Sequence, residues 1–273
     1  MLLSRETIQQ QLNINPEVQK TFVFDLDGTI VYNGKPVDQQ FEKFLIDIRD
    51  AGHQIVFATG RSFRDFIPVI PEWAVSEPSV VFGGGLVIAN DEIRYQQFIN
   101  DHYLHEIIDF LEDKHIHYLI DGQTNFYHPS REHWLYQDII KLTGRSRAES
   151  AHHAISDGAY KILVLEGEWF EHFNQFIADK DLTIKYHFYD NCFDIMPANV
   201  NKYNGFTQLK LDNTANTFVF GNDHNDLELM QNFTNSVMLG HHAELAKYAK
   251  VRINYDDNLY SNFKTVINTI LGK

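Results

Sequence analysis

The 273-residue chain has a single cysteine and a shortage of basic residues. One thiol, Cys192, excludes an internal disulfide framework and is typical of a protein from a reducing compartment. The 23 Lys and Arg residues face 37 Asp and Glu residues, so the formal net charge is 23 − 37 = −14. Because this charge repels the phosphates of DNA and RNA, we expect no nucleic-acid partner.

Long apolar runs are also missing. The N-terminal stretch MLLSRETIQQQL has no hydrophobic signal core, and no segment is apolar for long enough to span a bilayer. The 14 histidines form no HExxH motif, so a histidine-based metal site is not indicated. With 44% apolar and 22% charged residues, the chain is expected to be a cytoplasmic globular protein without a membrane partner.

A short apolar run that ends in two acids is the most informative stretch. Residues 22–24 are apolar in succession, which is typical of a strand buried on both faces of a parallel sheet. Asp25 and Asp27 come next, and Gly28 and Thr29 end the strand, so the carboxylates are expected where open α/β sheets bind ligands. Two acids this close repel each other unless one is protonated or a cation such as Mg²⁺ lies between them. An ordinary Asx-rich turn is the alternative interpretation.

A second strand is predicted over residues 54–58, after a helix that Asp38 caps and Gly52 ends. Strand, helix and strand with short loops form a βαβ unit, so the two strands are expected to be parallel. Thr59 then lies at the same edge of the sheet as Asp25, where its hydroxyl and nearby N–H groups can hold phosphate oxygens. The alternative is that Thr59 only caps a helix. Arg61 either contacts the substrate or forms a surface ion pair.

The pattern changes near residue 84 from βα units to hairpins with helices, and it changes back near residue 195. This organisation predicts a doubly wound, Rossmann-like parallel α/β core made of residues 1–83 and 195–273, with residues 1–19 as an N-terminal arm. Residues 84–194 are expected to form an inserted α+β cap domain that determines substrate specificity.

Four segments resemble the motifs of a known enzyme superfamily. Residues 24–30, FDLDGTI, resemble the first motif of the haloacid dehalogenase phosphotransferases, and ATGR at residues 58–61 resembles the second motif of their Cof-like branch. Lys202, which on its own reads as one surface lysine among many, matches the third motif, and residues 221–230 resemble the fourth. An insertion between the second and third motifs is also a feature of the Cof-like (type IIB) branch.

The resemblance implies roles for individual residues. Asp25 is the nucleophile that becomes an aspartyl-phosphate, and Asp27 is the general acid and then the general base. A carboxylate needs no base to act as a nucleophile at neutral pH, which agrees with this division. Thr59 and Lys202 complete the catalytic set. The implied phosphate-binding or substrate-binding residues are Gly28, Thr59, Gly60, Arg61, Lys202 and Asn225.

The fourth motif departs from the family at one position. Asn222 stands where the family has a metal-ligating Asp, and it offers a neutral carbonyl oxygen in place of a carboxylate. Asp223 is the alternative third ligand. The residues expected to hold Mg²⁺ are therefore Asp25, Asp27, Asn222, Asp223 and Asp226.

Together these features predict a Mg²⁺-dependent phosphatase that acts on a small phosphorylated metabolite. A sugar phosphate, a nucleotide and a phosphorylated cofactor remain open as substrates. The alternatives are a sugar phosphomutase, which would share the first chemical steps, and a catalytically silent binding or regulatory protein, which Asn222 suggests.

Overall fold

The apolar run around Phe22 forms β1 (Thr21–Phe24) in a computed structural model of the chain. The structure describes residues 2–122, 125–143, 151, 153–187, 191–211 and 214–273. It divides into two units, one made of Met1–Gly60, Val69–Arg94 and Asn201–Lys273, the other of Arg61–Pro68 and Tyr95–Val200. We call these the core unit and the second unit.

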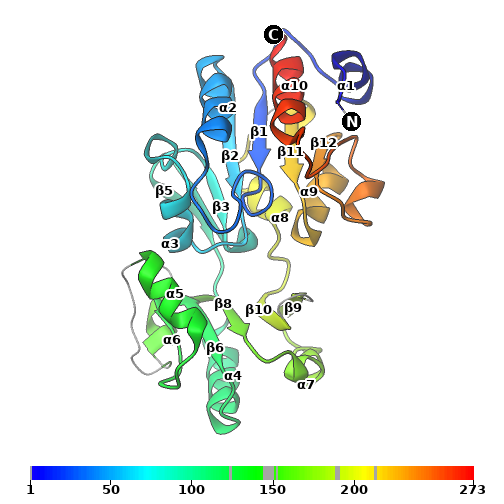
Figure 1. Ribbon diagram of the computed structural model, residues 1–273. Helices are drawn as coiled ribbons and strands as arrows, with labels where there is room; N and C mark the ends of the chain where they lie inside the picture. Colours follow the sequence, from blue (N-terminus) through cyan, green and yellow to red (C-terminus); the bar gives the residue numbers. More distant parts are fainter. Residues whose placement is uncertain (1, 123–124, 144–150, 152, 188–190, 212–213) are drawn as a thin grey trace. The chain divides into compact units, whose positions relative to one another are not determined.

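The core unit is built on an eight-stranded sheet with the order β13-β12-β11-β1-β2-β3-β4-β5. All pairings from β13 to β3 are parallel, whereas β4 runs antiparallel to β3. The chain winds outward from β1 in both directions, so the sheet is doubly wound and its switch point lies between β1 and β11 (Figure 1). The other strands are β2 (Gln54–Ala58), β3 (Ser79–Val81), β4 (Leu86–Ala89), β5 (Glu92–Gln96), β11 (Thr217–Gly221), β12 (Asn235–Leu239) and β13 (Val251–Ile253).

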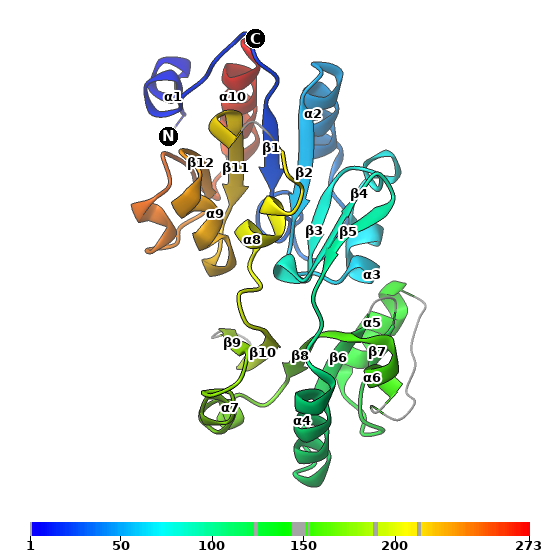
Figure 2. The same cartoon turned by 180° about the vertical axis from the view of Figure 1, so that it is seen from behind.

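Helices cover both faces of this sheet. Helices α2 and α10 pack together on one face, and α8 and α9 lie on the other (Figures 1 and 2). The core unit's helices are α1 (Arg5–Gln11), α2 (Gln39–Asp50), α8 (Lys202–Thr207), α9 (Leu227–Asn232) and α10 (Leu259–Leu271), with the 3₁₀ turns η2 (Glu72–Ala74), η3 (Phe82–Gly84), η5 (Thr214–Asn216), η6 (His224–Asp226) and η7 (Leu245–Lys247).

Phenylalanine rings join the sheet to its helices. Phe24 of β1 and Phe220 of β11 lie 4.7 Å apart between ring centroids, and both contact Phe263 of α10. Phe263 also meets Phe41 and Phe44 of α2 at 4.9 and 5.4 Å. The strands that carry the site residues are thus held in register by a continuous aromatic layer.

The expected helix after β1 is confirmed as α2. Asp38 is its N-cap and accepts hydrogen bonds from the backbone N–H groups of Gln40 and Phe41. Gly52 follows the helix with φ +78°, a conformation that favours glycine.

The N-terminal arm is attached to the core unit. It contains α1, whose Ile8 is buried, and its backbone is held at two points. The N–H of Leu3 donates to Asn262 at 2.8 Å, and the N–H of Asn13 donates to Asn235 at 2.7 Å. The arm therefore packs against α10 and the first residue of β12.

The second unit has its own antiparallel sheet, with the order β7-β6-β8-β10-β9. Its apolar core includes Ile107, Tyr118, Ile162 and Phe193. The strands are β6 (Tyr118–Gly122), β7 (Phe126–Tyr127), β8 (Ala159–Val164), β9 (Leu182–His187) and β10 (Cys192–Pro197). The helices are α3 (Phe63–Phe66), α4 (Asp101–Asp113), α5 (Trp134–Thr143), α6 (His153–Asp157) and α7 (Phe170–Phe176), with the 3₁₀ turns η1 (Ile67–Val69) and η4 (Gly167–Trp169). An α/β core with an inserted α+β region is the fold class that the sequence predicts.

The crossings between the units differ from the expected residues 84 and 195. The hairpin of β4 and β5 was assigned to the insertion, but β4 pairs with β3 and so extends the core sheet, which moves the crossing to Arg94. A short segment before it, residues 61–68, groups with the second unit, and its Arg64 forms an ion pair with Asp121 at 3.0 Å.

Some local details differ from the sequence patterns. The residues near 243–249 predict a helix, and the structure has only the 3₁₀ turn η7 there. The short strand β13 was not predicted. The sequence also predicts a hairpin around residues 121–122; β6 and β7 do pair antiparallel, but residues 121–122 belong to β6, and residues 123–124 lie outside the described part. Within the described residues, no helix is both long and apolar enough to cross a membrane.

The aromatic layer predicts a large stability loss for Phe263→Ala. Removing a buried ring leaves a cavity among four other rings, so we expect the unfolding free energy to fall by about 3–5 kcal/mol in urea titrations. The matched control is Lys264→Ala, an exposed neighbour on the same helix, which should change stability by less than about 0.5 kcal/mol. Equal losses in both variants would contradict this packing.

Candidate active site

The carboxyl end of β1 places the two acids of the first motif. The N–H of Asp25 donates to the carbonyl of Phe220 at 2.9 Å, which continues the pairing with β11 by one residue. The loop then turns sharply at Gly28, whose φ is +80°, and its N–H donates to the carbonyl of Val31 at 2.8 Å. This geometry buries the Asp25 side chain and leaves Asp27 exposed.

Lys202 lies fully buried beside Asp25. Its ammonium nitrogen is 2.6 Å from Asp25 Oδ1, 2.6 Å from Asp226 Oδ1 and 2.8 Å from Asn225 Oδ1. An ammonium group has three protons, so all three are used. Lys202 of the third motif therefore joins Asp25 of the first motif to Asn225 and Asp226 of the fourth.

Two glycines allow α8 to bring Lys202 into place. A Cβ on Gly84, which has φ +115°, would lie 2.2 Å from the carbonyl oxygen of Asn201, the N-cap of α8. A Cβ on Gly205 would lie 2.8 Å from the Cα of Gly84. The glycine run after β3 is thus a site of close backbone approach.

The charges of this cluster shift one another. Burial and, after it, the negative charge of Asp226 raise the pKa of Asp25, while Lys202 lowers it, and the net result is a pKa of about 7. For Lys202, burial alone would lower the pKa, but the carboxylates of Asp226 and Asp25 outweigh burial and raise it. Lys202 therefore remains a cation, and it favours the ionised form of Asp25.

Asp226 organises the loop after β11. Its Oδ2 accepts from the backbone N–H groups of Asn222 at 2.9 Å and Asp223 at 3.2 Å, while Oδ1 accepts from Lys202. Gly221 makes room for this carboxylate, because a Cβ there would lie 2.4 Å from its Cγ. Asp223 caps η6, and its side chain is 65% exposed.

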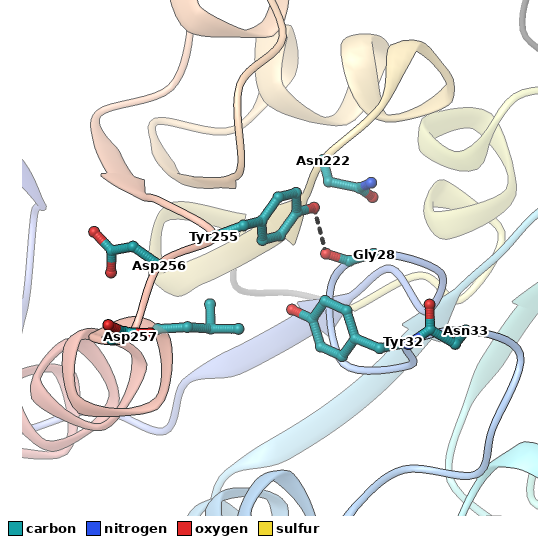
Figure 3. A pocket seen from close by; sticks show the side chains of 8 residues that line it. Gly28, Tyr32, Asn33, Asn222, Tyr255, Asp256 and Asp257 are labelled. Atoms are coloured by element: carbon teal, nitrogen blue, oxygen red, sulfur yellow. Dashed lines mark hydrogen bonds between the residues drawn. The ribbon is translucent and has the colours of Figure 1, made fainter.

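Thr29 links Asp25 to Asn222. Its buried hydroxyl lies 3.1 Å from Asp25 Oδ2 and 3.2 Å from Asn222 Oδ1. In the sequence Thr29 marks only the end of the predicted strand, although it follows Asp25 by four residues. Tyr255 was missed entirely, and its hydroxyl donates to the carbonyl of Gly28 at 2.6 Å in the pocket of Figure 3.

The second-motif residues take up different positions. Thr59 is buried and pairs through its backbone with Val80 and Gly83. It is not the N-cap of α3, because Ser62 caps that helix.

Gly60 lies beside Asn225, whose Nδ2 would be 3.6 Å from a Cβ there. Arg61 belongs to the second unit and donates to the carbonyl of Asp65 at 3.1 Å, so its phosphate contact stays a prediction.

The oxygen atoms near Thr29 fit a magnesium site in which only one side-chain ligand is charged. Across the described residues, no three His, Cys, Asp or Glu side chains gather in a way that could hold a metal. Asp25 Oδ2 and Asn222 Oδ1 nevertheless converge on the same hydroxyl, which supplies one carboxylate and one amide oxygen. Mg²⁺ often binds through one or two carboxylates and keeps several waters, so this donor set suits it.

Comparisons with known proteins agree on one family. The haloacid dehalogenase-like hydrolase family matches residues 22–258. Curated protein sequences give no match. Among solved structures, a HAD/COF-like hydrolase from Plasmodium vivax has 18% identity and a TM-score of 0.79, with 96% of this chain and 99% of that chain covered.

Two further structures are similar. TM0651 from Thermotoga maritima has 16% identity and a TM-score of 0.74, with 91% of this chain and 97% of that chain covered. The subclass IIB sugar phosphatase BT4131 has 15% identity and a TM-score of 0.72, with 90% of this chain and 98% of that chain covered. At these identities the similarity concerns the fold.

The buried ammonium predicts a pH-dependent stability loss for Lys202→Met. Without the cation, Asp25 and Asp226 face each other unpaired, so we expect the unfolding free energy at pH 7 to fall by about 3–5 kcal/mol. A carboxyl whose pKa is raised by folding stabilises the folded state below its unfolded pKa, and this contribution is lost as the pH rises through the folded pKa. The loss should therefore be smaller at pH 5 than at pH 8.

Urea titrations of the metal-free protein at these pH values check this expectation. The matched control is Lys247→Met, which removes an exposed lysine of the core unit and should change stability by less than about 0.5 kcal/mol. A loss for Lys202→Met that is the same at every pH would contradict the proposed charge balance.

Proposed function

The chain belongs to the haloacid dehalogenase-like hydrolases, and we propose that it is a Mg²⁺-dependent phosphatase that uses Asp25 as a covalent nucleophile. The observation that carries this proposal is the buried ammonium of Lys202, which donates hydrogen bonds to Asp25, Asn225 and Asp226. A single cation among two carboxylates fixes one oxygen of Asp25, and Thr29 fixes the other. Such preorganisation is the main way in which proteins accelerate phosphoryl transfer.

In the first chemical step, an oxygen of Asp25 attacks the phosphorus of a phosphomonoester. An O–P bond forms to Asp25 as the ester P–O bond breaks, and Asp27 gives a proton to the leaving oxygen. The exposure of Asp27 supports this role, because the leaving group departs toward solvent. Lys202 donates to one oxygen of Asp25 and Thr29 to the other, so lone pairs remain for the attack.

In the second step, Asp27 takes a proton from a water molecule, whose oxygen attacks the phosphorus. The bond to Asp25 breaks, inorganic phosphate leaves, and both carboxyl groups return to their starting states. Thr59 and Gly60, at the carboxyl end of β2, are proposed to bind the phosphate oxygens together with Gly28, Arg61 and Asn225. Lys202, whose three protons are used by its protein partners, is proposed to contribute its positive charge.

The proposed Mg²⁺ ligands are a carboxylate oxygen of Asp25, the main-chain carbonyl of Asp27 and Oδ1 of Asn222. When bound, the ion neutralises charge on the transferring phosphoryl group and orients it. The shared Thr29 hydroxyl supports Asn222 over Asp223 as the third ligand, because Asp223 caps η6 and is largely exposed. Asp226 is proposed to hold a coordinated water, in addition to its contacts with Lys202 and the loop.

The second unit is proposed as the domain that selects the substrate. Its antiparallel sheet is inserted between the second and third motifs. The structurally similar BT4131 is a sugar phosphatase, which supports a sugar phosphate as one substrate class. A nucleotide or a phosphorylated cofactor remains a candidate of the same chemistry. A panel of purified phosphorylated sugars, nucleotides and cofactors tests the class directly.

Asn222 is the observation behind a second candidate, a catalytically silent binding protein. The loss of one carboxylate weakens the expected metal site. Hydrolysis of an aryl phosphate that requires Mg²⁺ would exclude this candidate. A phosphomutase would instead be activated strongly by a bisphosphate.

We predict that Asp25→Asn abolishes turnover of an aryl phosphate in the presence of Mg²⁺. The amide is nearly isosteric but cannot act as the nucleophile, so the rate should fall at least 100-fold while circular dichroism is unchanged. The matched control is Asp109→Asn, a carboxylate on α4 of the second unit, which should retain most of the activity. A residual rate for Asp25→Asn above about a hundredth of wild type would reject the covalent role.

A further inference from the structure

Two tyrosines that the proposed mechanism does not use hold the loop after β1. The hydroxyl of Tyr255 donates to the Gly28 carbonyl at 2.6 Å (Figure 3). The hydroxyl of Tyr32 donates to the next carbonyl, that of Thr29, at 2.9 Å. Both rings line a pocket of about 560 Å³ and meet edge-on, with 6.1 Å between their centroids. Two successive carbonyl groups of the loop thus each have a tyrosine hydroxyl as donor.

The ring of Tyr255 is placed by packing as well as by its hydroxyl. A Cβ on Gly240, which has φ +73°, would lie 2.2 Å from Cε2 of Tyr255, so the glycine makes room for the ring. The edge-on contact with Tyr32 holds the ring on another side. Tyr255 is 51% exposed, so water can replace its hydroxyl as the partner of the Gly28 carbonyl. Tyr255→Phe keeps the ring contacts and is therefore expected to fold.

The peptide between Gly28 and Thr29 receives one of its two hydrogen bonds from Tyr255. Its N–H belongs to Thr29 and donates to the Leu26 carbonyl at 2.9 Å, an acceptor that it shares with two further N–H groups of the same turn. A carbonyl has two lone pairs for these three donors, so this bond alone holds the peptide weakly. The hydroxyl of Tyr255 fixes the other end of the peptide, at its carbonyl oxygen.

This peptide determines the direction of Asp27 relative to Asp25. Thr29 is attached to Asp25, because its hydroxyl donates to Oδ2 at 3.1 Å. Between Thr29 and Asp27 lies only Gly28, which has φ +80° and, without a Cβ, rotates more freely than other residues. A rotation of the peptide after Gly28 would turn the exposed side chain of Asp27 away from Asp25. The bond from Tyr255 opposes this rotation.

We propose that Tyr255 is a positioning residue that, through the Gly28 carbonyl, keeps Asp27 within reach of the leaving oxygen of the substrate. This inference rests on the proposed function, in which Asp27 gives a proton to that oxygen, and deepens it. A general acid must lie about 2.6–3.2 Å from the atom that it protonates, and it contributes roughly 10²–10⁴-fold to the rate. Loss of the hydroxyl should therefore impair proton transfer more than the attack by Asp25.

Leaving groups of different basicity separate the two effects. The para-nitrophenyl ester of phosphate releases a weakly basic anion that needs little help from an acid, whereas the para-methoxyphenyl ester, of similar size, releases a more basic one. The measured quantity is kcat/KM with Mg²⁺ present, which covers the steps up to the transfer of phosphorus to Asp25. We expect Tyr255→Phe to lower kcat/KM at least about tenfold for the methoxyphenyl ester and less than about threefold for the nitrophenyl ester.

Two variants calibrate this comparison. Asp27→Asn removes the acid, so its kcat/KM should depend most steeply on the leaving group, and adding Tyr255→Phe should not make it steeper. The matched control is Tyr248→Phe, which removes a hydroxyl from a tyrosine of the core unit that is 39% exposed, and it should leave kcat/KM for both esters unchanged. A purely structural role of Tyr255 would slow both esters equally.

The hydrogen bond itself is measured by NMR without substrate or metal. Gly28 and Thr29 form the only Gly-Thr pair in the sequence. Protein labelled with ¹³C in the glycine carbonyls and with ¹⁵N in threonine therefore gives a single signal for this peptide in a spectrum that correlates each N–H with the preceding carbonyl. Tyr255→Phe should shift the ¹³C frequency of this signal, whereas Tyr248→Phe should not.

Two results would overturn the inference while leaving the proposed function standing. One is a Gly28 carbonyl signal that Tyr255→Phe does not move, and the other is an equal loss of kcat/KM for the two esters. If wild type hydrolyses neither ester, the proposed function is wrong and the role of Tyr255 in placing Asp27 is rejected with it. The carbonyl signal then still decides whether Tyr255 holds the loop.

Discussion

The buried ammonium of Lys202 is the interaction on which the arrangement of the site depends. It is the meeting point of a carboxylate after β1 and two side chains of the loop after β11. Each carboxylate alone would be costly to bury, and the cation between them makes their burial possible. The packing of Gly84 and Gly205, the cap of Asn201 and the turn around Asp226 all serve to bring the start of α8 to this point.

The charge of the buried cluster connects this arrangement to the proposed chemistry. The formal charges of Lys202, Asp25 and Asp226 sum to +1 − 1 − 1 = −1. An Asp at position 222 would add a further negative charge, whereas Asn222 does not. The expected result is a weaker attraction for Mg²⁺ and a weaker repulsion of a phosphate dianion, in a protein whose net charge of −14 already opposes anionic substrates.

The sequence was sufficient to predict a strand or helix wherever a local residue pattern determines that element. Continuous apolar residues predict β1 and β11 as buried strands, and their carboxyl ends bring Asp25 and Asn222 to one edge of the sheet. The β4–β5 hairpin was also predicted, but the sheet that it joins depends on pairing with β3, which its own residues do not encode. The short strand β13 escaped detection because three residues are too few for a periodic pattern. Tyr255 escaped because its partner Gly28 is 227 residues away in the chain.

The central claim is that Asp25 forms a covalent bond to phosphorus, and chemical trapping of this bond tests it most directly. The protein is mixed with an aryl phosphate and Mg²⁺, quenched in acid within the first turnovers, and reduced with borohydride, which converts an aspartyl-phosphate to homoserine. The account predicts homoserine at position 25, located by mass spectrometry of peptides, and its absence when the substrate is omitted. Release of phosphate without any modification at position 25 would contradict it.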